Sequence, residues 1–357
     1  MKSLKRQRKI LTTSNNQLKD PLKTASYDYQ LPDNLIATYP VQPADSAKLL
    51  VYHRATKQIT HTNFTHLLDF IPIKTEIFFN DTKVIKARIF GQKSTGGQVE
   101  LLLNKPLANN TYLVFIRGKV KVGTILQFDS NLVVEVIALQ DDGSRIVKFF
   151  LHNQTLDFLS LVEILNTIGH LPLPPYLKRE DEKDDEKTYQ TLFAKKYGAV
   201  AAPTASLHFT PQLLENLKRN YHTNYLTLHV GAGTFKPVEV ENILDHPMHS
   251  EYFEIPKESC SVLDSHKKIL AIGTTVTRTI EFYNKTKQTF GEANIFLNPL
   301  NTPKRVDYLL TNFHLPKSTL IMLVASFIGL EETLNLYNVA VKNNYRFFSY
   351  GDGMLII

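Results

Sequence analysis

The sequence predicts an α/β large domain built from discontinuous chain segments, with a small antiparallel β unit inserted into it. Between residues 84 and 151, short strand-like runs recur with Gly, Asn or Asp turns between them, which is typical of a small closed or sandwiched β unit. On either side, strand-like and helix-like runs alternate, as they do in an α/β sheet. We therefore expect the large domain to comprise residues 26–83 and 152–357, and residues 84–151 to form the inserted domain.

The elements of the large domain follow from local signals. Apolar residues at helical spacing predict a helix that ends at Gly169, and Thr210-Pro211 has the hydroxyl cap and first-turn proline of a helix start. Polar residues recur just after the strand-like runs, where α/β sheets gather ligands. The expected strands are 48–54, 58–62, 76–79, 226–230, 269–272, 308–310 and 346–349, and the expected helices include 64–70, 156–168, 317–329 and 331–343.

Length and composition limit the class of protein. A chain of 357 residues with 43% hydrophobic residues can build one large or two ordinary domains. The single cysteine, Cys260, excludes an internal disulfide framework and a cysteine-ligated iron–sulfur cluster. No apolar run approaches the roughly 20 residues of a membrane helix. We expect a cytoplasmic protein without a membrane segment, and a monomer.

The positive charge is unevenly distributed along the chain. Residues 1–23 carry +6 of the net charge of +7, so a nucleic-acid surface on the folded part must be a local patch. We expect residues 1–25 to be a basic, disordered extension that is dispensable for chemistry, although a basic arm on RNA phosphates or a transit peptide is an alternative. The wholly charged segment 178–187 is expected to be a solvated, mobile loop.

The stretch from Gly198 to Phe235 carries most of the chemical signals. It contains GAVAAPTASLHFT and, after a helix-like run, LTLHVGAGTF. Small residues let a ligand approach the backbone, and His208 and His229 can move protons near neutral pH. Each half also has a plain structural interpretation, since a GxG after a strand is often only a tight turn and a strand histidine is often a core residue.

Longer blocks extend this signal over most of the chain, from about residue 26 to the C-terminus. They include YDYQLPDNLIATYP (27–40), NDTKVIKARIFG (80–91), YQTLFAKKYGAVAAPTASLHFT (189–210), LTLHVGAGTFKPV (226–238), TNFHLPKSTLIMLVASFIG (311–329) and YRFFSYGDGMLII (345–357). In these blocks and their order, the sequence resembles the S-adenosylmethionine:tRNA ribosyltransferase-isomerases of queuosine biosynthesis. The resemblance implies that the inserted unit is a small β-barrel.

The resemblance also implies a reaction and its partners. The family transfers and isomerises the ribosyl moiety of S-adenosylmethionine onto 7-aminomethyl-7-deazaguanine at the tRNA wobble position, giving epoxyqueuosine, adenine and methionine. S-adenosylmethionine is consumed as the ribosyl donor, and no other cofactor is expected. A base must remove a proton beside the sulfonium, and an acid helps adenine to leave. Such chemistry needs proton carriers and positioned donors, not a metal.

Candidate residues lie within the matching blocks, and each of them could instead be structural. The spacing of His246, His249 and Glu251 is not a standard zinc pattern, so no metal ligand is expected. Phe313 and Tyr350 could stack on a flipped base or belong to the core. The candidate proton carriers are His208, His229, His249, Glu251 and His314, and the candidate substrate-binding residues are Asp81, Arg88, Thr204, Gly231, Gly233, Thr234, Thr274, Thr275, Arg278, Asn312, Lys317 and Asp352.

The sequence departs from the family pattern at several positions. Ser206 replaces a frequent glycine, which could demand a changed backbone angle, and Asn298-Pro299-Leu300 replaces Tyr-Pro-Gly. Two other functions compete with the family assignment. A conventional methyltransferase is disfavoured because its nucleotide-binding fingerprint should lie near the start of the α/β domain, and a tRNA-binding protein without catalysis is disfavoured because nearly every polar block is retained.

Overall fold

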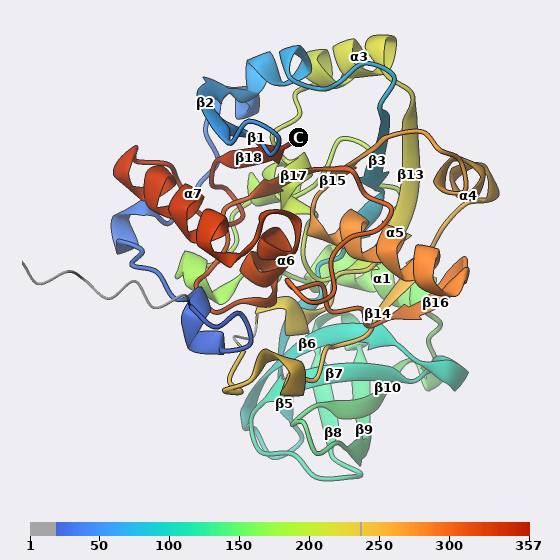
Figure 1. Cartoon of the computed structure of the whole chain (residues 1–357). Helices are drawn as coiled ribbons and strands as arrows, with labels where there is room; N and C mark the ends of the chain where they lie inside the picture. The colour runs from blue at the N-terminus through green and yellow to red at the C-terminus, as the bar shows by residue number, and fades with distance from the viewer. Residues whose placement is uncertain (1–18, 236–237) are drawn as a thin grey trace, which may run out of the picture.

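The computed structural model describes residues 19–235 and 238–357, which form a large mixed sheet with helices and a separate β-barrel (Figure 1). The expectation of a disordered extension falls mostly on residues 1–18, which lie outside the described residues. The last part of that segment is tied to the fold, because Lys23 forms a bridge with Asn242 and η1 follows at Thr24–Tyr27.

The large domain is organised around a nine-stranded sheet in the order β16-β14-β13-β3-β15-β17-β18-β1-β2. Four neighbours, β13, β3, β15 and β17, run parallel, so their carboxyl ends meet along one edge. The strands are β1 (Lys48–His53), β2 (Gln58–Asn63), β3 (Glu76–Asn80), β13 (Thr223–Leu228), β14 (Glu251–Glu254), β15 (Ile269–Ile272), β16 (Phe290–Ala293), β17 (Tyr308–Asn312) and β18 (Gly353–Ile356).

Helices cover both faces of this sheet, which is why its central strands are apolar throughout. On β3, Phe78 packs with the residues of α4 and α5, whereas its neighbours Ile77 and Phe79 pack on the opposite face with α3. Figure 1 shows α5, α6 and α7 together on one side of the sheet. The helices are α3 (Pro211–Asn220), α4 (Lys257–Leu263), α5 (Thr274–Thr286), α6 (Thr319–Ile328) and α7 (Leu330–Lys342).

The inserted unit is a closed antiparallel barrel, as the predicted fold class requires. Six strands follow the order β10-β7-β6-β5-β8-β9, and pairing of β9 with β10 closes the ring, while β11 (Gln154–Thr155) extends one edge. Alternate side chains fill the interior, and α1 (Phe158–Ile168) packs against it through Leu161, Val162 and Leu165. The barrel strands are β5 (Arg88–Lys93), β6 (Gln98–Pro106), β7 (Tyr112–Arg117), β8 (Ile125–Phe128), β9 (Val133–Leu139) and β10 (Arg145–Leu151).

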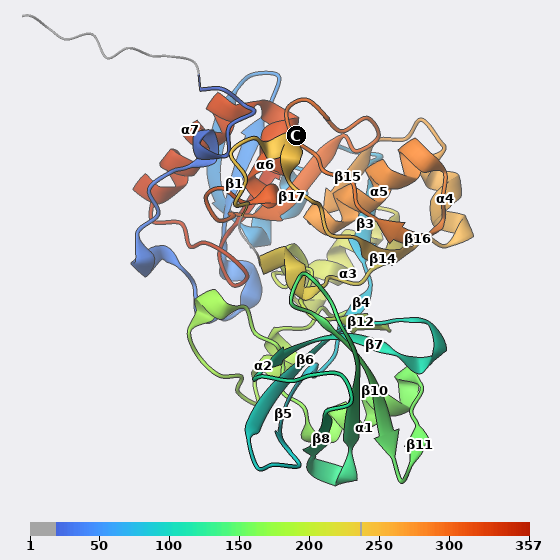
Figure 2. The ribbon, with the colours of Figure 1, turned by 90° about the horizontal axis from the view of Figure 1, so that it is seen from below.

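Two short parallel strands join the barrel to the large domain. β4 (Thr82–Val84) leaves the end of β3 and pairs with β12 (Lys196–Ala199), on which the chain returns (Figure 2). The chain therefore enters and leaves the barrel beside the carboxyl edge of the large sheet. Domain boundaries at residues 84 and 151 stay a prediction.

The expected last strand at 346–349 is wrong. This segment makes only one isolated bridge, between Phe347 and Ile36, and Phe348 has a φ of 72°. The final strand is instead β18, whose apolar residues Met354, Leu355 and Ile356 are fully buried between β17 and β1. Aromatic residues at 346–349 resembled a strand, but they pack as a bent loop.

The charged segment 178–187 also differs from the solvated loop expected. Asp185 is only 3% exposed and accepts two hydrogen bonds from Arg179, at 2.6 and 2.7 Å, and one from the Tyr350 hydroxyl at 2.9 Å. Burial alone would raise the pKa of Asp185, but these hydrogen bonds outweigh it and the pKa is lowered. The pair anchors the segment, whose helix α2 covers Asp185–Thr188.

Among residues 19–235 and 238–357, no single helix is long and apolar enough to cross a membrane. The helices α6 and α7 pass the test of length and composition only as a pair, and they are bent by 113° at their junction. Most of α6, from Ile321 to Ser326, is buried in the core under the sheet, which accounts for its apolar sequence.

Candidate active site

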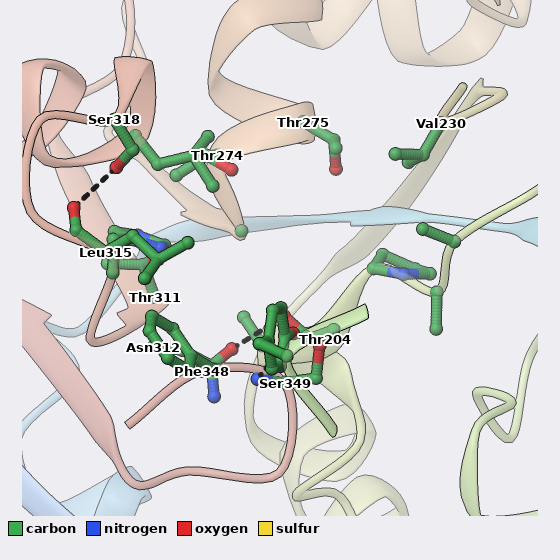
Figure 3. A pocket seen from close by; sticks show the side chains of 18 of the residues that line it. Thr204, Val230, Thr274, Thr275, Thr311, Asn312, Leu315, Ser318, Phe348 and Ser349 are labelled. Atoms are coloured by element: carbon green, nitrogen blue, oxygen red, sulfur yellow. Dashed lines mark hydrogen bonds between the residues drawn. The ribbon is translucent and has the colours of Figure 1, made fainter. Parts of the chain in front are cut away.

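Three adjoining pockets lie at the carboxyl edge of the parallel strands. The first, with about 880 Å³ of open space, is called the hydroxyl pocket because threonine and serine hydroxyls surround it and no charged carboxylate, Lys or Arg lines it. Figure 3 shows Thr274 and Thr275 at the start of α5 facing this space, with Phe348 and Ser349 on the opposite side. Its lining includes Tyr176, Tyr189, Ala201–Ala205, Val230, Gly273–Thr275, Thr311, Asn312, His314, Leu315, Ser318, Leu320, Phe348 and Ser349.

A chain of hydrogen bonds fixes one wall of the hydroxyl pocket. The Thr204 hydroxyl, in η8 (Thr204–Ser206), donates to Asn312 Oδ1 at 2.9 Å (Figure 3), and Asn312 Nδ2 donates to His208 Nε2 at 3.1 Å. His208 stacks on Phe64 with ring centroids 4.2 Å apart and does not line the pocket. Burial lowers the pKa of His208 to about 3, so its ring stays neutral and orients Asn312.

The opposite wall is the first turn of α5, which follows β15. Gly273 is its N-cap and has no side chain to accept from the first N–H groups of the helix. Thr274 and Thr275 line the pocket at this turn. Beside them, His314 Nε2 is 2.9 Å from the Thr311 hydroxyl, and burial lowers the pKa of His314 to about 3. This pocket is therefore polar but uncharged at neutral pH.

The second pocket, called the Arg278 pocket, has about 360 Å³ of open space and is centred on a buried ion pair. Arg278 of α5 bonds to Glu251 Oε2, and Glu251 Oε1 accepts from the Gly231 N–H at 3.2 Å. Arg278 is 9% exposed, and its Nε has no hydrogen-bond partner among the residues that the structure describes. The pocket is lined by Gly233, His246, Met248, His249, Glu251, Arg278, Thr319 and Leu320.

Gly233 makes room for His249 in this pocket. A Cβ at position 233 would lie 2.7 Å from the His249 ring, so only glycine permits the observed contact. Within the described part of the chain, neither ring nitrogen of His249 makes a hydrogen bond, and its ring therefore remains available to a ligand. His246 stacks edge-on against Phe296 at 6.0 Å, and burial lowers its pKa.

The third pocket, called the barrel-side pocket, lies where β6 of the barrel meets the large domain, with about 770 Å³ of open space. His229 Nδ1 is 2.7 Å from the Thr82 hydroxyl, and its ring stacks on Tyr252. Burial lowers the pKa of His229 to about 4. Gly198 has a φ of 150° and abuts this ring, where a Cβ would come within 2.7 Å. The lining is Asn104, Lys105, Pro106, Phe158, Tyr197, Gly198, His229, Gly231, Ser250, Glu251, Tyr252 and Glu292.

The three pockets share lining residues and therefore adjoin one another. Leu320 lines both the hydroxyl pocket and the Arg278 pocket, and Glu251 lines both the Arg278 pocket and the barrel-side pocket. Consecutive residues Val230 and Gly231 lie in the hydroxyl and barrel-side pockets respectively. The three pockets therefore form one composite site at the carboxyl edge of the sheet.

Most of the predicted site residues come together here, although their roles stay predictions. The residues that line a pocket are Thr204, His229, Gly231, Gly233, His249, Glu251, Thr274, Thr275, Arg278, Asn312 and His314. Thr234 lies in η9 (Ala232–Phe235), and its side chain lies outside the described residues. Phe313 is fully buried between Tyr337 and Phe347, as an ordinary core aromatic.

Four predicted substrate-binding residues lie away from the three pockets and already have protein partners. Asp81 accepts from the Thr227 hydroxyl at 2.6 Å, and burial raises its pKa. Asp352 accepts from the backbone N–H groups of residues 48 and 346, at 2.9 and 2.7 Å. Arg88 pairs with Glu100 on the barrel and with Glu180 in the charged segment 178–187, and Lys317 pairs with Asp28 at 2.6 Å. These contacts hold elements in place.

Several residues that line the pockets were not predicted from the sequence, because they come from segments far from the predicted motifs. Tyr176 and Tyr189 come from the connection after the barrel, and Phe348 and Ser349 come from the segment taken for a strand. The barrel adds Asn104 and Lys105 to the third pocket. The proline-rich run PLPPY at residues 172–176, which ends at Tyr176, is a local sequence signal of an extended path in this connection. Among the described residues, no group of three or more His, Cys, Asp or Glu side chains is arranged to hold a metal ion.

The fold and these pockets define an α/β protein with an inserted barrel and a composite ligand site at the carboxyl edge of its sheet. The family model described as "Queuosine biosynthesis protein" matches residues 24–356. This chain belongs to that family.

Similar proteins agree in length as well as sequence. A protein of Aliarcobacter butzleri is 70% identical over 338 residues, covering 95% of this chain and 99% of its own, and one of a Nitratiruptor species is 63% identical with the same coverage. Both are named S-adenosylmethionine:tRNA ribosyltransferase-isomerase. The crystal structure of an S-adenosylmethionine tRNA ribosyltransferase from Thermotoga maritima is 32% identical, with a TM-score of 0.53, covering 93% of this chain and all of that one.

Proposed function

We propose that this chain transfers and isomerises the ribosyl moiety of S-adenosylmethionine onto 7-aminomethyl-7-deazaguanine at the tRNA wobble position, giving epoxyqueuosine-tRNA, adenine and methionine. The observation that carries the proposal is the family match over residues 24–356, which includes all four strand ends that build the pockets. S-adenosylmethionine is consumed as the donor, and the proton transfers require neither a metal nor a further cofactor.

The adenosine part of the donor occupies the hydroxyl pocket. This pocket offers aromatic and small apolar walls for a purine, together with Thr204 and Asn312 as neutral hydrogen-bonding groups. Because no carboxylate, Lys or Arg lines it, the neutral nucleoside fits it better than the charged methionine part does. First-turn N–H groups of α5 supply donors at the end nearest Thr274.

The methionine part extends past Leu320 into the Arg278 pocket. The free Nε of Arg278 can donate to the methionine carboxylate, and Glu251 is placed to attract the cationic ammonium and sulfonium groups. This orientation brings the CH2 group beside the sulfonium toward His249. Among the three candidate histidines in the pockets, His229 and His314 each have a ring nitrogen against a threonine hydroxyl, whereas His249 is free to take the proton.

The barrel contributes to tRNA binding. Residues 84–151 contain nine Lys and Arg residues against five Asp and Glu residues, a net charge of +4 in a part of the chain that borders the barrel-side pocket. One chain builds all three pockets, which supports a monomer as the active unit, and a tRNA substrate supports action in the cytoplasm.

Product analysis tests the proposal. With S-adenosylmethionine and tRNA carrying 7-aminomethyl-7-deazaguanine, we expect equal amounts of adenine and methionine, and a tRNA that gains an epoxycyclopentanediol group by mass spectrometry. A methyltransferase would give S-adenosylhomocysteine and a tRNA heavier by one methyl group, and a binding protein would give neither. S-adenosylhomocysteine without free adenine would disprove the proposed function.

A further inference from the structure

The barrel-side pocket has a different chemistry from the two pockets beside it. It combines partly exposed aromatic rings with a carboxylate that already holds an ammonium group. Tyr252 is 39% exposed, and Tyr197 belongs to the same lining. Lys105 Nζ donates to both oxygens of Glu292, at 3.2 and 3.1 Å. From this arrangement we propose that the barrel-side pocket is the subsite for the acceptor base, a flat heterocycle that bears a primary ammonium group.

The aromatic rings supply the contact that a base taken out of an RNA loop needs. Unstacked bases are commonly held on tyrosine rings. One side of the Tyr252 ring is occupied by His229, whose ring lies 5.7 Å away at an interplanar angle of 18°. Since Tyr252 is nevertheless more than one third exposed, part of its surface remains for a ligand. Tyr197 is held by Lys83, whose Nζ lies 4.5 Å from the ring centroid.

The ion pair shows where the ammonium group of the acceptor would sit. Glu292 belongs to β16 of the large sheet, and Lys105 belongs to β6 of the barrel. The Glu292 side chain is 44% exposed, so an incoming ammonium can replace Lys105 without breaking a buried pair. The distances of 3.1 and 3.2 Å are those of an ammonium on a carboxylate, and a primary aminomethyl group has the same donors.

The neighbouring pockets fit this ligand less well. The hydroxyl pocket has no carboxylate to hold an ammonium group. The Arg278 pocket is less than half as large as the barrel-side pocket, and its carboxylate, Glu251, is paired with the buried Arg278 guanidinium. The barrel-side pocket also lies at the junction with the basic barrel, where RNA would approach, and Glu251 joins it to the Arg278 pocket. Acceptor and donor would thus meet at Glu251. This assignment rests on the proposed function.

Binding without turnover tests the assignment. Two anticodon stem-loop RNAs are compared by fluorescence anisotropy, one with 7-aminomethyl-7-deazaguanine at the wobble position and one with guanine. We expect the unmodified protein to prefer the first RNA by roughly tenfold, as a hydrogen bond to a charged group predicts. Glu292→Gln should abolish this preference while leaving the affinity for the guanine RNA unchanged. Lys105→Met should increase the preference, because it frees Glu292 from its present partner.

Stacking is tested separately with Tyr252→Ala, which should lower the affinity for both RNAs by roughly 5- to 150-fold. Glu254→Gln is the matched control for Glu292, because Glu254 is 42% exposed, pairs with Lys196 at 2.7 Å and lies on the adjacent strand outside the pocket. Tyr39→Ala, at an exposed tyrosine far along the chain, is the control for Tyr252. Both controls should bind like the unmodified protein.

Two results would overturn the assignment. One is a Glu292→Gln variant that keeps its preference for the aminomethyl base, and the other is a Tyr252→Ala variant that binds both RNAs within twofold of the unmodified protein. Neither result depends on turnover. The proposed function fails on a different observation, the absence of adenine and methionine release, so the two ideas can fail separately.

Discussion

The hydroxyl pocket and the Arg278 pocket adjoin at Leu320, yet they position their polar groups by opposite means. In the hydroxyl pocket, neutral groups hold one another, from Thr204 through Asn312 to His208. In the Arg278 pocket, a buried carboxylate and a buried guanidinium hold each other. The neutral network suits an uncharged nucleoside, and the ion pair suits the charged end of the same donor molecule. The contrast predicts that substitutions in the two pockets will differ in how strongly they affect kcat, KM and the free energy of unfolding.

The largest effect is expected at His249, where we place the proton acceptor. His249→Gln keeps a polar side chain of similar reach but removes the basic nitrogen, so kcat should fall by roughly 10²- to 10⁴-fold. The KM values should change little, because the substitution removes no binding group. The rate of adenine release is measured by chromatography at saturating concentrations of both substrates. A kcat within tenfold of the value for the unmodified protein would show that His249 is not the proton acceptor.

Arg278→Met should produce the largest loss of stability. It leaves Glu251 buried without its cation, which costs about 3–5 kcal/mol in comparable cases. Urea unfolding measures the loss. Adding Glu251→Met to the same chain removes the carboxylate that has lost its cation, and the double variant should recover much of the lost stability while remaining inactive. If the single and double variants were equally unstable, packing and not charge would explain the cost.

The buried histidines predict how stability depends on pH. The pKa of His314 is lowered to about 3 and that of His229 to about 4, whereas an unfolded histidine titrates near 6.5. Below pH 6.5 the unfolded chain therefore binds protons that the folded chain does not, and stability falls as the pH falls from about 6.5 toward 4.

Unfolding in urea at pH 7, 6 and 5 tests this dependence. His314 should account for about 2 kcal/mol of the loss by pH 5, so His314→Gln should show a shallower decline than the unmodified protein. Parallel curves for the two proteins would mean that His314 is protonated in the folded state. This test also separates the two pockets. At low pH the hydroxyl pocket should lose stability because protonation of His314 introduces a charge into it.

A smaller effect is expected at Thr204, on the neutral network itself. Thr204→Val removes the hydroxyl that donates to Asn312 Oδ1 at 2.9 Å, and this should cost about 0.5–1.5 kcal/mol. Because Asn312 then loses its orientation, the KM for S-adenosylmethionine should rise by a few fold while the KM for tRNA stays constant. Thr204→Ser, which keeps the donor, should restore both values. An equal rise in both KM values would argue against separate donor and acceptor subsites.

The smallest effect is expected at Arg88, which the sequence placed among the substrate-binding residues. Its partners, Glu100 on the barrel and Glu180 in the segment 178–187, lie outside the three pockets. Arg88→Gln should change stability by no more than about 1 kcal/mol, because these pairs are partly exposed, and should change kcat by less than twofold. Steady-state kinetics and urea unfolding check both values. A large rise in the KM for tRNA would contradict this prediction and would indicate that Arg88 contacts the tRNA.

Local sequence determined much of this protein. The Thr210-Pro211 signal started α3 as expected, with the Thr210 hydroxyl accepting from the Leu213 N–H at 3.2 Å. Ser206 fits inside η8 without a positive φ, so the serine that replaces a family glycine needs no unusual backbone angle. Such features depend on neighbours within a few residues, where capping and propensity act. The long matching blocks determined the family for the same reason, since they can be read one segment at a time.

Only the tertiary structure decided which candidates share a site. His208 and His314 carry the same side chain in equally suggestive motifs, yet Phe64 and Asn312 cover His208 while His314 lines the hydroxyl pocket. Lys105 and Glu292 are 187 residues apart in sequence, and nothing local to either predicts that they meet. Burial and long-range pairing depend on how the barrel and the sheet come together, and that arrangement is a property of the whole chain.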